Sequence, residues 1–222
     1  MLLLPFAVGV LESGPAWPQV PLLVAWLTGY CASYFAFLAI KTRRPRRVLP
    51  QLAVHGSLAV VATALTLWLV PSLIAFAPLM GALLVVNGWY AWRKDERWIV
   101  NDLVAVAEAC LMVPIAAEAG GAPLRTGWLA AGVLFLYFAG TAFYVKTMIR
   151  ERGRVAWRRA SLAWHVAAVP LAWLVAWPLG LVFLLLLARA VVLPTLPLRP
   201  RTVGLVEVGS CVLLLVLVPL TT

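Results

Sequence analysis

The sequence predicts an all-α protein, in which a single integral membrane domain of about nine transmembrane helices covers residues 1–222. Composition supports this class, because 64% of the residues are hydrophobic, only 12% are charged and the mean hydropathy is +0.99. A soluble domain could not bury that much apolar surface. Charge placement also supports it: sixteen of the eighteen lysine and arginine residues fall in four short segments that separate long apolar stretches.

The four basic segments alternate along the chain with connections that carry almost no positive charge. They are Lys41–Arg47, Arg93–Arg97, Lys146–Arg159 and Arg199–Arg201, whereas the other connections carry only Arg125. This alternation is typical of the positive-inside pattern of polytopic membrane proteins. We therefore expect a multi-pass protein of the cell membrane with cytoplasmic basic segments. Given the net charge of +10, we expect membrane lipids as partners. Nucleic acid is not an expected partner, because no recognition motif accompanies the charge.

Each long apolar stretch is interpreted as one crossing, because a membrane helix needs about 20 apolar residues. The predicted helices are Met1–Leu11, Val20–Ile40, Gln51–Val70, Leu73–Trp92, Trp98–Ala117, Gly127–Met148, Ser161–Trp177, Leu179–Leu193 and Val203–Leu220. The first of them is short for a crossing, so we expect a first helix that is short or truncated. Tryptophan residues stand near many of the predicted ends, as is common at membrane interfaces.

Two boundaries depend on proline, which can mark either a turn between two helices or a kink within one. They are at Pro71 and Pro178. Length favours a turn at both, because Gln51–Trp92 and Ser161–Leu193 are each too long for a single crossing.

Polar side chains within the predicted helices gather in the half of the membrane next to the basic segments. Four of them lie six residues from an arginine of these segments, which corresponds to about 9 Å of helix: Asn87, Tyr144, His165 and Glu207. Glu108 lies deeper, close to the bilayer midplane. The simplest hypothesis is a polar cavity open to the cytoplasm, with Glu108 towards its floor. The residues expected to line it are Asn87, Asn101, Asp102, His55, Tyr144, His165 and Glu207.

This cavity predicts two sets of functional residues. The catalytic candidates are Asp102, His165 and Glu108, with Asp102 or His165 as a general base and Glu108 as a titrating group. The ligand-binding candidates are Asn87, Asn101, Tyr144, Lys146, Arg150, Arg152, Arg154 and Glu207. The basic members would hold a phosphate or diphosphate head group, for which arginine offers bidentate geometry. We expect no cofactor and no metal site, because the sequence has neither a Walker-type loop nor a Cys/His cluster.

Structural roles compete with these functional ones. Asn101 or Asp102 could cap a helix that begins there, and Glu207 could pair with Arg189 across neighbouring helices. The histidines could serve helix packing, and the long basic segment could lie on anionic lipid. Glu108 is the acid hardest to explain structurally, because its own helix holds no basic residue that could neutralise it.

Several segments resemble the bacterial YwiC-like membrane proteins. They are Met1–Phe6 (MLLLPF), Asn101–Leu103 (NDL), Phe143–Arg152 (FYVKTMIRER) and Ser161–His165 (SLAWH). The likeness spans essentially the full chain, with Tyr144–Arg152 as its most specific part. Members of the family usually carry a His-Gly-Ala-Trp-like segment just before the counterpart of Met1, so the resemblance implies a start that is truncated or assigned too late. It implies a membrane fold but no mechanism.

The nine-helix plan also resembles the UbiA-type intramembrane prenyltransferases. Those enzymes hold Mg²⁺ and a prenyl diphosphate with Asp-rich motifs after helices two and six, and the matching segments Lys41–Arg47 and Lys146–Arg159 contain no aspartate. Metal-bridged diphosphate binding needs clustered carboxylates, so that chemistry is absent or altered. We expect a UbiA-like bundle that binds or modifies an isoprenoid or other amphipathic lipid, by a prenyltransferase-like reaction if it is an enzyme. A transporter or flippase and a non-catalytic assembly protein are the alternatives.

Overall fold

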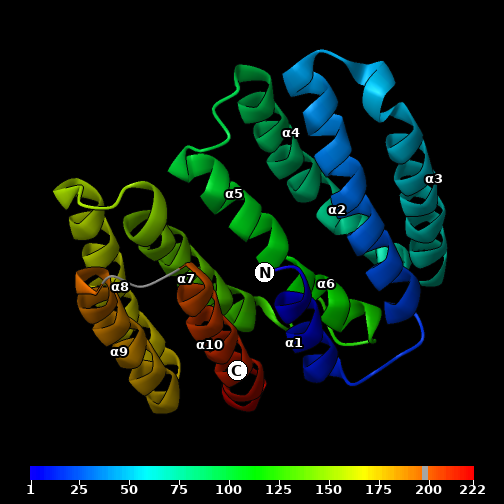
Figure 1. Cartoon of the computed structure of the whole chain (residues 1–222). Helices are drawn as coiled ribbons and strands as arrows, with labels where there is room; N and C mark the ends of the chain where they lie inside the picture. Colours follow the sequence, from blue (N-terminus) through cyan, green and yellow to red (C-terminus); the bar gives the residue numbers. More distant parts are fainter. Residues whose placement is uncertain (197–199) are drawn as a thin grey trace. The chain divides into compact units, whose positions relative to one another are not determined.

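The computed structural model of the chain describes residues 1–196 and 200–222, and Arg199 of the fourth basic segment lies outside them (Figure 1). The α-helices are α1 (Leu3–Ser13), α2 (Gln19–Thr42), α3 (Pro45–Leu69), α4 (Ala77–Arg93), α5 (Ile99–Cys110), α6 (Met112–Ala119), α7 (Trp128–Val145), α8 (Val155–Val175), α9 (Trp177–Val192) and α10 (Pro200–Thr221). Three short segments adjoin them: the 3₁₀ helix η1 (Pro71–Phe76), the π turn η2 (Lys146–Arg150) and the 3₁₀ turn η3 (Leu193–Thr195). The described residues contain no strand, which confirms the all-α prediction.

Within the described ranges these segments make nine helical spans once continuous pieces are joined, as predicted. The joined pieces are η1 with α4, α5 with α6 at Leu111, α7 with η2, and α9 with η3. Seven spans are long and apolar enough to cross a membrane, as expected of a multi-pass membrane protein. The first helix, α1, is shorter, as expected. The remaining span, α8, is less apolar because Arg158, Arg159 and His165 occupy its first half.

Two basic segments form shorter loops than predicted, because helices include many of their residues. The structure begins α3 at Pro45 instead of Gln51, and α8 at Val155 instead of Ser161. Since η2 also extends α7, the connection before α8 shortens to Glu151–Arg154. Long basic side chains can reach the level of the head groups from the end of a helix, so a run of arginines does not require a loop.

Both proline boundaries are turns between helices, as predicted. Val70 alone separates α3 from η1, and Ala176 alone separates α8 from α9, with extended backbone at φ −160° and ψ 141°. The α8–α9 turn is packed tightly, because a Cβ atom added at Gly180 would clash with the ring of Trp173. The two helices therefore form a closed hairpin.

The helices group into two compact units, Leu2–Trp128 (the N-terminal unit) and Leu129–Thr222 (the C-terminal unit). In the N-terminal unit α2 packs along α3 and α4, α1 packs against α6, and α4 packs against α5 (Figure 1). Its core includes Phe6, Leu22, Phe76, Met112 and Ile115. In the C-terminal unit α9 packs against both α8 and α10, over a core of Tyr144, Met148, Ala190 and Val203. The single domain expected over residues 1–222 stays a prediction.

Candidate functional site

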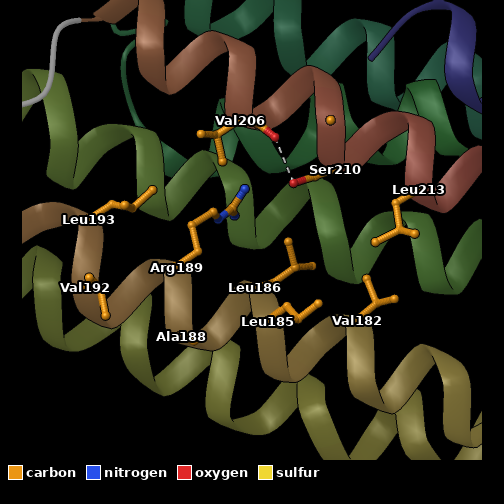
Figure 2. Close-up of a pocket in the computed structure, with 11 residues that line it drawn as sticks. Val182, Leu185, Leu186, Ala188, Arg189, Val192, Leu193, Val206, Ser210 and Leu213 are labelled. Atoms are coloured by element: carbon orange, nitrogen blue, oxygen red, sulfur yellow. Dashed lines mark hydrogen bonds between the residues drawn. The ribbon is translucent and has the colours of Figure 1, made fainter.

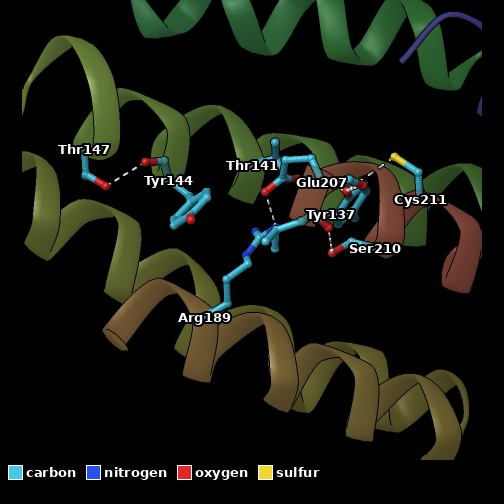
Figure 3. A network of polar contacts seen from close by, with 9 residues as sticks. Tyr137, Thr141, Tyr144, Thr147, Arg189, Glu207, Ser210 and Cys211 are labelled. Carbon is cyan, nitrogen blue, oxygen red and sulfur yellow. Dashed lines mark hydrogen bonds and ion pairs between the residues drawn. The ribbon is translucent and has the colours of Figure 1, made fainter. Parts of the chain in front are cut away.

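Glu207 of α10 is the centre of a polar network in the C-terminal unit (Figure 3). Its carboxylate forms an ion pair with Arg189 of α9. It also accepts hydrogen bonds from Tyr137 Oη and Thr141 Oγ1 of α7, both at 3.0 Å. Helices α7, α9 and α10 therefore meet at one carboxylate, and the pairing of Glu207 with Arg189, left open by the sequence, is present.

The α7 side of this network is one helical stripe. Tyr137, Thr141 and Tyr144 follow one another at spacings of four and three residues, which places them on the same face. The Tyr144 ring centroid lies 4.3 Å from Arg189 Cζ, a cation–π contact. Tyr144 was predicted from the sequence and Tyr137 and Thr141 were not, although the stripe that they share with Tyr144 could have identified them.

Arg189 keeps two hydrogen-bond donors unused. Its side chain is buried, with the residue 8% exposed, and pairs with Glu207 through Nη1. Nε and Nη2 are buried and have no hydrogen-bond partner among the described residues. A buried donor without a partner destabilises a fold by about 1–3 kcal/mol, so this arrangement favours an external acceptor at Arg189.

Arg189 points into an apolar groove between α9 and α10 (Figure 2). The groove has a volume of about 520 Å³ and is lined by Val182, Leu185, Leu186, Ala188, Arg189, Val192, Leu193, Val206, Gly209, Ser210 and Leu213. The Ser210 hydroxyl donates to the carbonyl of Val206 at 3.0 Å, which leaves Arg189 as the strongest polar feature. Ligand pockets are typically about 300–1,000 Å³ and mostly apolar with a few polar groups, which this groove matches.

His165 joins α8 to α7. Its Nδ1 lies 2.7 Å from the carbonyl oxygen of Ser161, one turn earlier on α8. The other side of the ring packs against Gly140 of α7, where an added Cβ atom would lie 3.2 Å from Nε2. The neighbouring Trp164 donates from Nε1 to the carbonyl of Leu136 at 3.0 Å. Both faces of His165 are thus engaged by the fold, which favours a packing role.

The predicted phosphate ligands lie around the junction of α7 and α8: Lys146, Arg150, Arg152 and Arg154. Arg152 Nη2 lies 3.5 Å from the carbonyl of Leu196, so this junction is next to the end of α9. Arg154 pairs with Glu151 at 2.8 Å, and the Lys146 ammonium lies 5.5 Å from the ring centroid of Trp157. Arg150 is exposed. Of these basic residues, Arg152 is therefore the one that a described contact brings towards the Leu193 end of the groove.

Glu108 of α5, which is half-buried, belongs to the N-terminal unit and has a different environment. Asn87 of α4 donates from Nδ2 to Glu108 Oε2 at 3.0 Å, and no ion pair reaches Glu108 from the described residues. An ionised acid at mid-helix costs about 2.5–3.5 kcal/mol on insertion scales. A hydrogen bond to a charged group contributes about 1.5–3 kcal/mol, so at the middle of these two ranges Asn87 alone does not fully offset a charge on Glu108.

Asn101 and Asp102 lie in the first turn of α5, and neither caps it. The helix begins at Ile99, with Trp98 at the N-cap position and no side-chain hydrogen bond from it. The capping alternative is therefore wrong. Asn101 Nδ2 donates to the carbonyl of Glu96 at 3.1 Å. Asp102 is half-buried, and its negative charge is favourable near a helix N-terminus.

Comparison with known proteins decides the family. The model of the YwiC-like protein family matches residues 1–117. The chain belongs to the YwiC-like family. It is 29% identical to the "Uncharacterized protein YwiC" of Bacillus subtilis (strain 168) over 177 residues, which are 75% of this chain and 70% of that protein. It is 28% identical to an "Uncharacterized protein" of Haemophilus influenzae over 230 residues, covering 100% of this chain and 94% of that one.

These findings confirm the resemblance to the YwiC-like proteins. No solved structure matches the chain, so its likeness to the UbiA-type prenyltransferases stays a prediction.

The structure divides the predicted cavity residues of this YwiC-like protein between its two units. The N-terminal unit brings Asn87 into contact with Glu108, while Asn101 and Asp102 stand nearer the start of α5. The C-terminal unit brings Tyr144 and Glu207 together around Arg189, with His165 between α7 and α8. One shared cavity open to the cytoplasm stays a prediction.

Proposed function

We propose that this protein binds an amphipathic lipid with a phosphate head group in the groove between α9 and α10. The observation that carries the proposal is the position of Arg189, which lines an otherwise apolar groove and has two buried donors without a hydrogen-bond partner among the described residues. The protein would act in the cell membrane, with its basic segments in the cytoplasm, as their alternation along the chain indicates.

The groove suits the apolar tail of such a lipid. Aliphatic side chains line it from Leu193 near the loop end to Val182 and Leu213 at the other end (Figure 2). Leu185 and Leu213 are also exposed at the protein surface. An acyl or isoprenoid chain could therefore enter from the surrounding bilayer without crossing a polar barrier.

The head group would lie at the Arg189 end. Because Glu207 already balances the charge of Arg189, a phosphate needs further positive charge nearby. Arg150 and Arg152 can supply it, since the contact between Arg152 and Leu196 holds their turn beside the end of α9. Charge-assisted hydrogen bonds from arginine to phosphate are short and strong.

The geometry supports binding better than catalysis. His165 is engaged by Ser161 on one side and packed against Gly140 on the other. Asp102, the second candidate for a general base, belongs to the N-terminal unit. A general base must reach the proton that it removes, and no described contact brings either residue to the groove.

Two glycines of α10 allow a matched test. Gly209 lines the groove and Gly204 does not, and an added Cβ atom meets nothing within 4 Å at either position. Gly209→Leu should fill the groove without a clash in the fold, while Gly204→Leu makes the same change elsewhere on the helix. Delipidated protein would be titrated with a fluorescent phosphatidic acid and with the diacylglycerol that has the same chains but no phosphate.

We expect phosphatidic acid to bind the wild type and Gly204→Leu equally, and Gly209→Leu about tenfold more weakly or worse, a loss of about 1.4 kcal/mol. Diacylglycerol should bind the wild type more weakly than phosphatidic acid does. Equal binding of phosphatidic acid by all three proteins would show that the groove is not the binding site. Equal binding of phosphatidic acid and diacylglycerol by the wild type would show that the phosphate is not recognised.

A further inference from the structure

We propose that Glu108 and Asn87 form a proton-binding site in the N-terminal unit, in which the Glu108 carboxyl carries the proton at neutral pH. This inference is independent of the lipid groove, because it rests on different helices and different contacts.

The Asn87 amide favours a protonated carboxyl group at Glu108. Asn87 is 7% exposed, and its Nδ2 donates to Glu108 Oε2 at 3.0 Å, so the amide faces the carboxyl group. Its Oδ1 is buried and has no donor among the described residues. An ionised carboxylate only accepts hydrogen bonds, whereas a protonated one also donates. A proton on Glu108 therefore provides the kind of donor that Asn87 lacks.

The charged and titratable groups around Glu108 also favour a proton there. Helix α5 packs against α4 and continues into α6. The titratable or charged residues on these helices are Tyr90 and Arg93 on α4, Asp102 and Cys110 on α5, and Glu118 on α6. Arg93 is engaged at the end of α4, at 3.7 Å from Asp95 and over the ring of Trp89. In the described part of the chain none of these groups pairs with Glu108, so a proton is the available means of neutralising it.

A proton also fits better than a metal ion. Asn87 and Glu108 together supply at most three side-chain oxygens. Mg²⁺ requires octahedral coordination and Ca²⁺ takes 6–8 oxygen ligands. The neighbouring buried side chains, Val106 and Ala109, are apolar. A site of this kind, which takes up a proton within the membrane and can release it, is the chemistry on which proton relays and proton-coupled carriers depend.

The test uses the full-length protein in nanodiscs and the variant Glu108→Gln. Glutamine is the neutral isostere of a protonated glutamate, since it keeps an acceptor for Asn87 Nδ2 and adds a donor. Infrared spectroscopy at neutral pH would record the C=O stretching band of protonated carboxylic acids, and thermal unfolding would be followed from mildly acidic to alkaline pH. Glu118→Gln is the matched control, because Glu118 is a buried acid of the same unit and its Oε2 has no described partner.

We expect Glu108→Gln to remove a protonated-carboxyl band that Glu118→Gln leaves in place. Wild type and Glu108→Gln should unfold at the same temperature in acid, and only the wild type should lose stability as the pH rises from the range in which an unfolded glutamate ionises to the point where native Glu108 releases its proton. A band unchanged by Glu108→Gln would overturn the proposal, and so would a variant less stable than wild type at every pH. If Na⁺ stabilises the wild type more than K⁺ does, and Glu108→Gln loses this difference, the site binds a metal cation and the proton proposal is wrong.

Discussion

Each unit has a glutamate within an apolar helix, but the two carboxyl groups have very different polar partners. Glu207, in the C-terminal unit, meets a guanidinium and two hydroxyl donors contributed by two other helices. Glu108, in the N-terminal unit, meets one amide. Because a charge in an apolar helix must be paired or neutralised, the first arrangement fits a fixed ion pair and the second fits a carboxyl group that takes up a proton.

Under the proposal for Glu108, this difference separates an acid that stabilises the fold from one that takes up a proton, although both lie in apolar helices. The ion pair of Glu207 ties α7, α9 and α10 together beside the groove, so its loss should act on folding. The amide contact of Glu108 carries little energy, so changes there should act on protonation. Substitutions in the two environments should therefore have effects of different size.

The largest effect is expected from Arg189→Leu, which leaves Glu207 buried without its cation. Breaking a buried ion pair from one side costs about 3–5 kcal/mol, and thermal unfolding of the purified protein would measure the loss. The double variant Arg189→Leu/Glu207→Leu should recover most of it, because it removes the uncompensated charge as well. A double variant as unstable as the single one would show that Glu207 is not the cause.

An intermediate effect is expected from Thr141→Val, which keeps the side-chain shape and removes one donor to the Glu207 carboxylate. Hydrogen bonds to charged groups contribute about 1.5–3 kcal/mol to the free energy of unfolding. Thr147→Val is the matched control, since Thr147 donates to a neutral acceptor, the carbonyl of Tyr144, and should cost about 0.5–1.5 kcal/mol. Equal losses in the two variants would mean that Glu207 is uncharged.

The smallest effect is expected from Asn87→Leu in the N-terminal unit. If Glu108 is neutral, the substitution removes one ordinary hydrogen bond and should lower the free energy of unfolding at neutral pH by about 0.5–1.5 kcal/mol. If Glu108 were ionised, the loss of its amide partner would leave a bare charge, and the change would approach the size expected for Arg189→Leu. The loss of unfolding free energy in Asn87→Leu, relative to that in Arg189→Leu, therefore tests whether Glu108 is neutral while Glu207 is charged.

The helices could be predicted from the sequence because apolar runs and basic segments reflect the membrane directly. Boundaries were less accurate at Pro45 and Val155, where helices extend into arginine-rich sequence. Such sequence is compatible with either a loop or a helix end, because arginine side chains can reach water from both. The turns at Val70 and Ala176 followed from length alone.

The candidate site was predictable only in part. Depth along a helix follows from residue number, which singled out Asn87, Tyr144, Glu108 and Glu207, and it also suggested the pair of Glu207 with Arg189. The direction in which each helix turns towards its neighbours does not follow from residue number. The contact of Asn87 with Glu108 and the groove beside Arg189 therefore needed the structure.

The one-residue connection at Ala176 also bears on how the chain enters the membrane. Since nothing else separates α8 from α9, the end of one helix and the start of the other must occupy the same side of the bilayer throughout biogenesis. Helix α8 carries two arginines and a histidine in its first half, while α9 is among the spans apolar enough to cross alone. We therefore expect the strongly apolar α9 to assist the membrane insertion of α8, with the two helices entering as one hairpin.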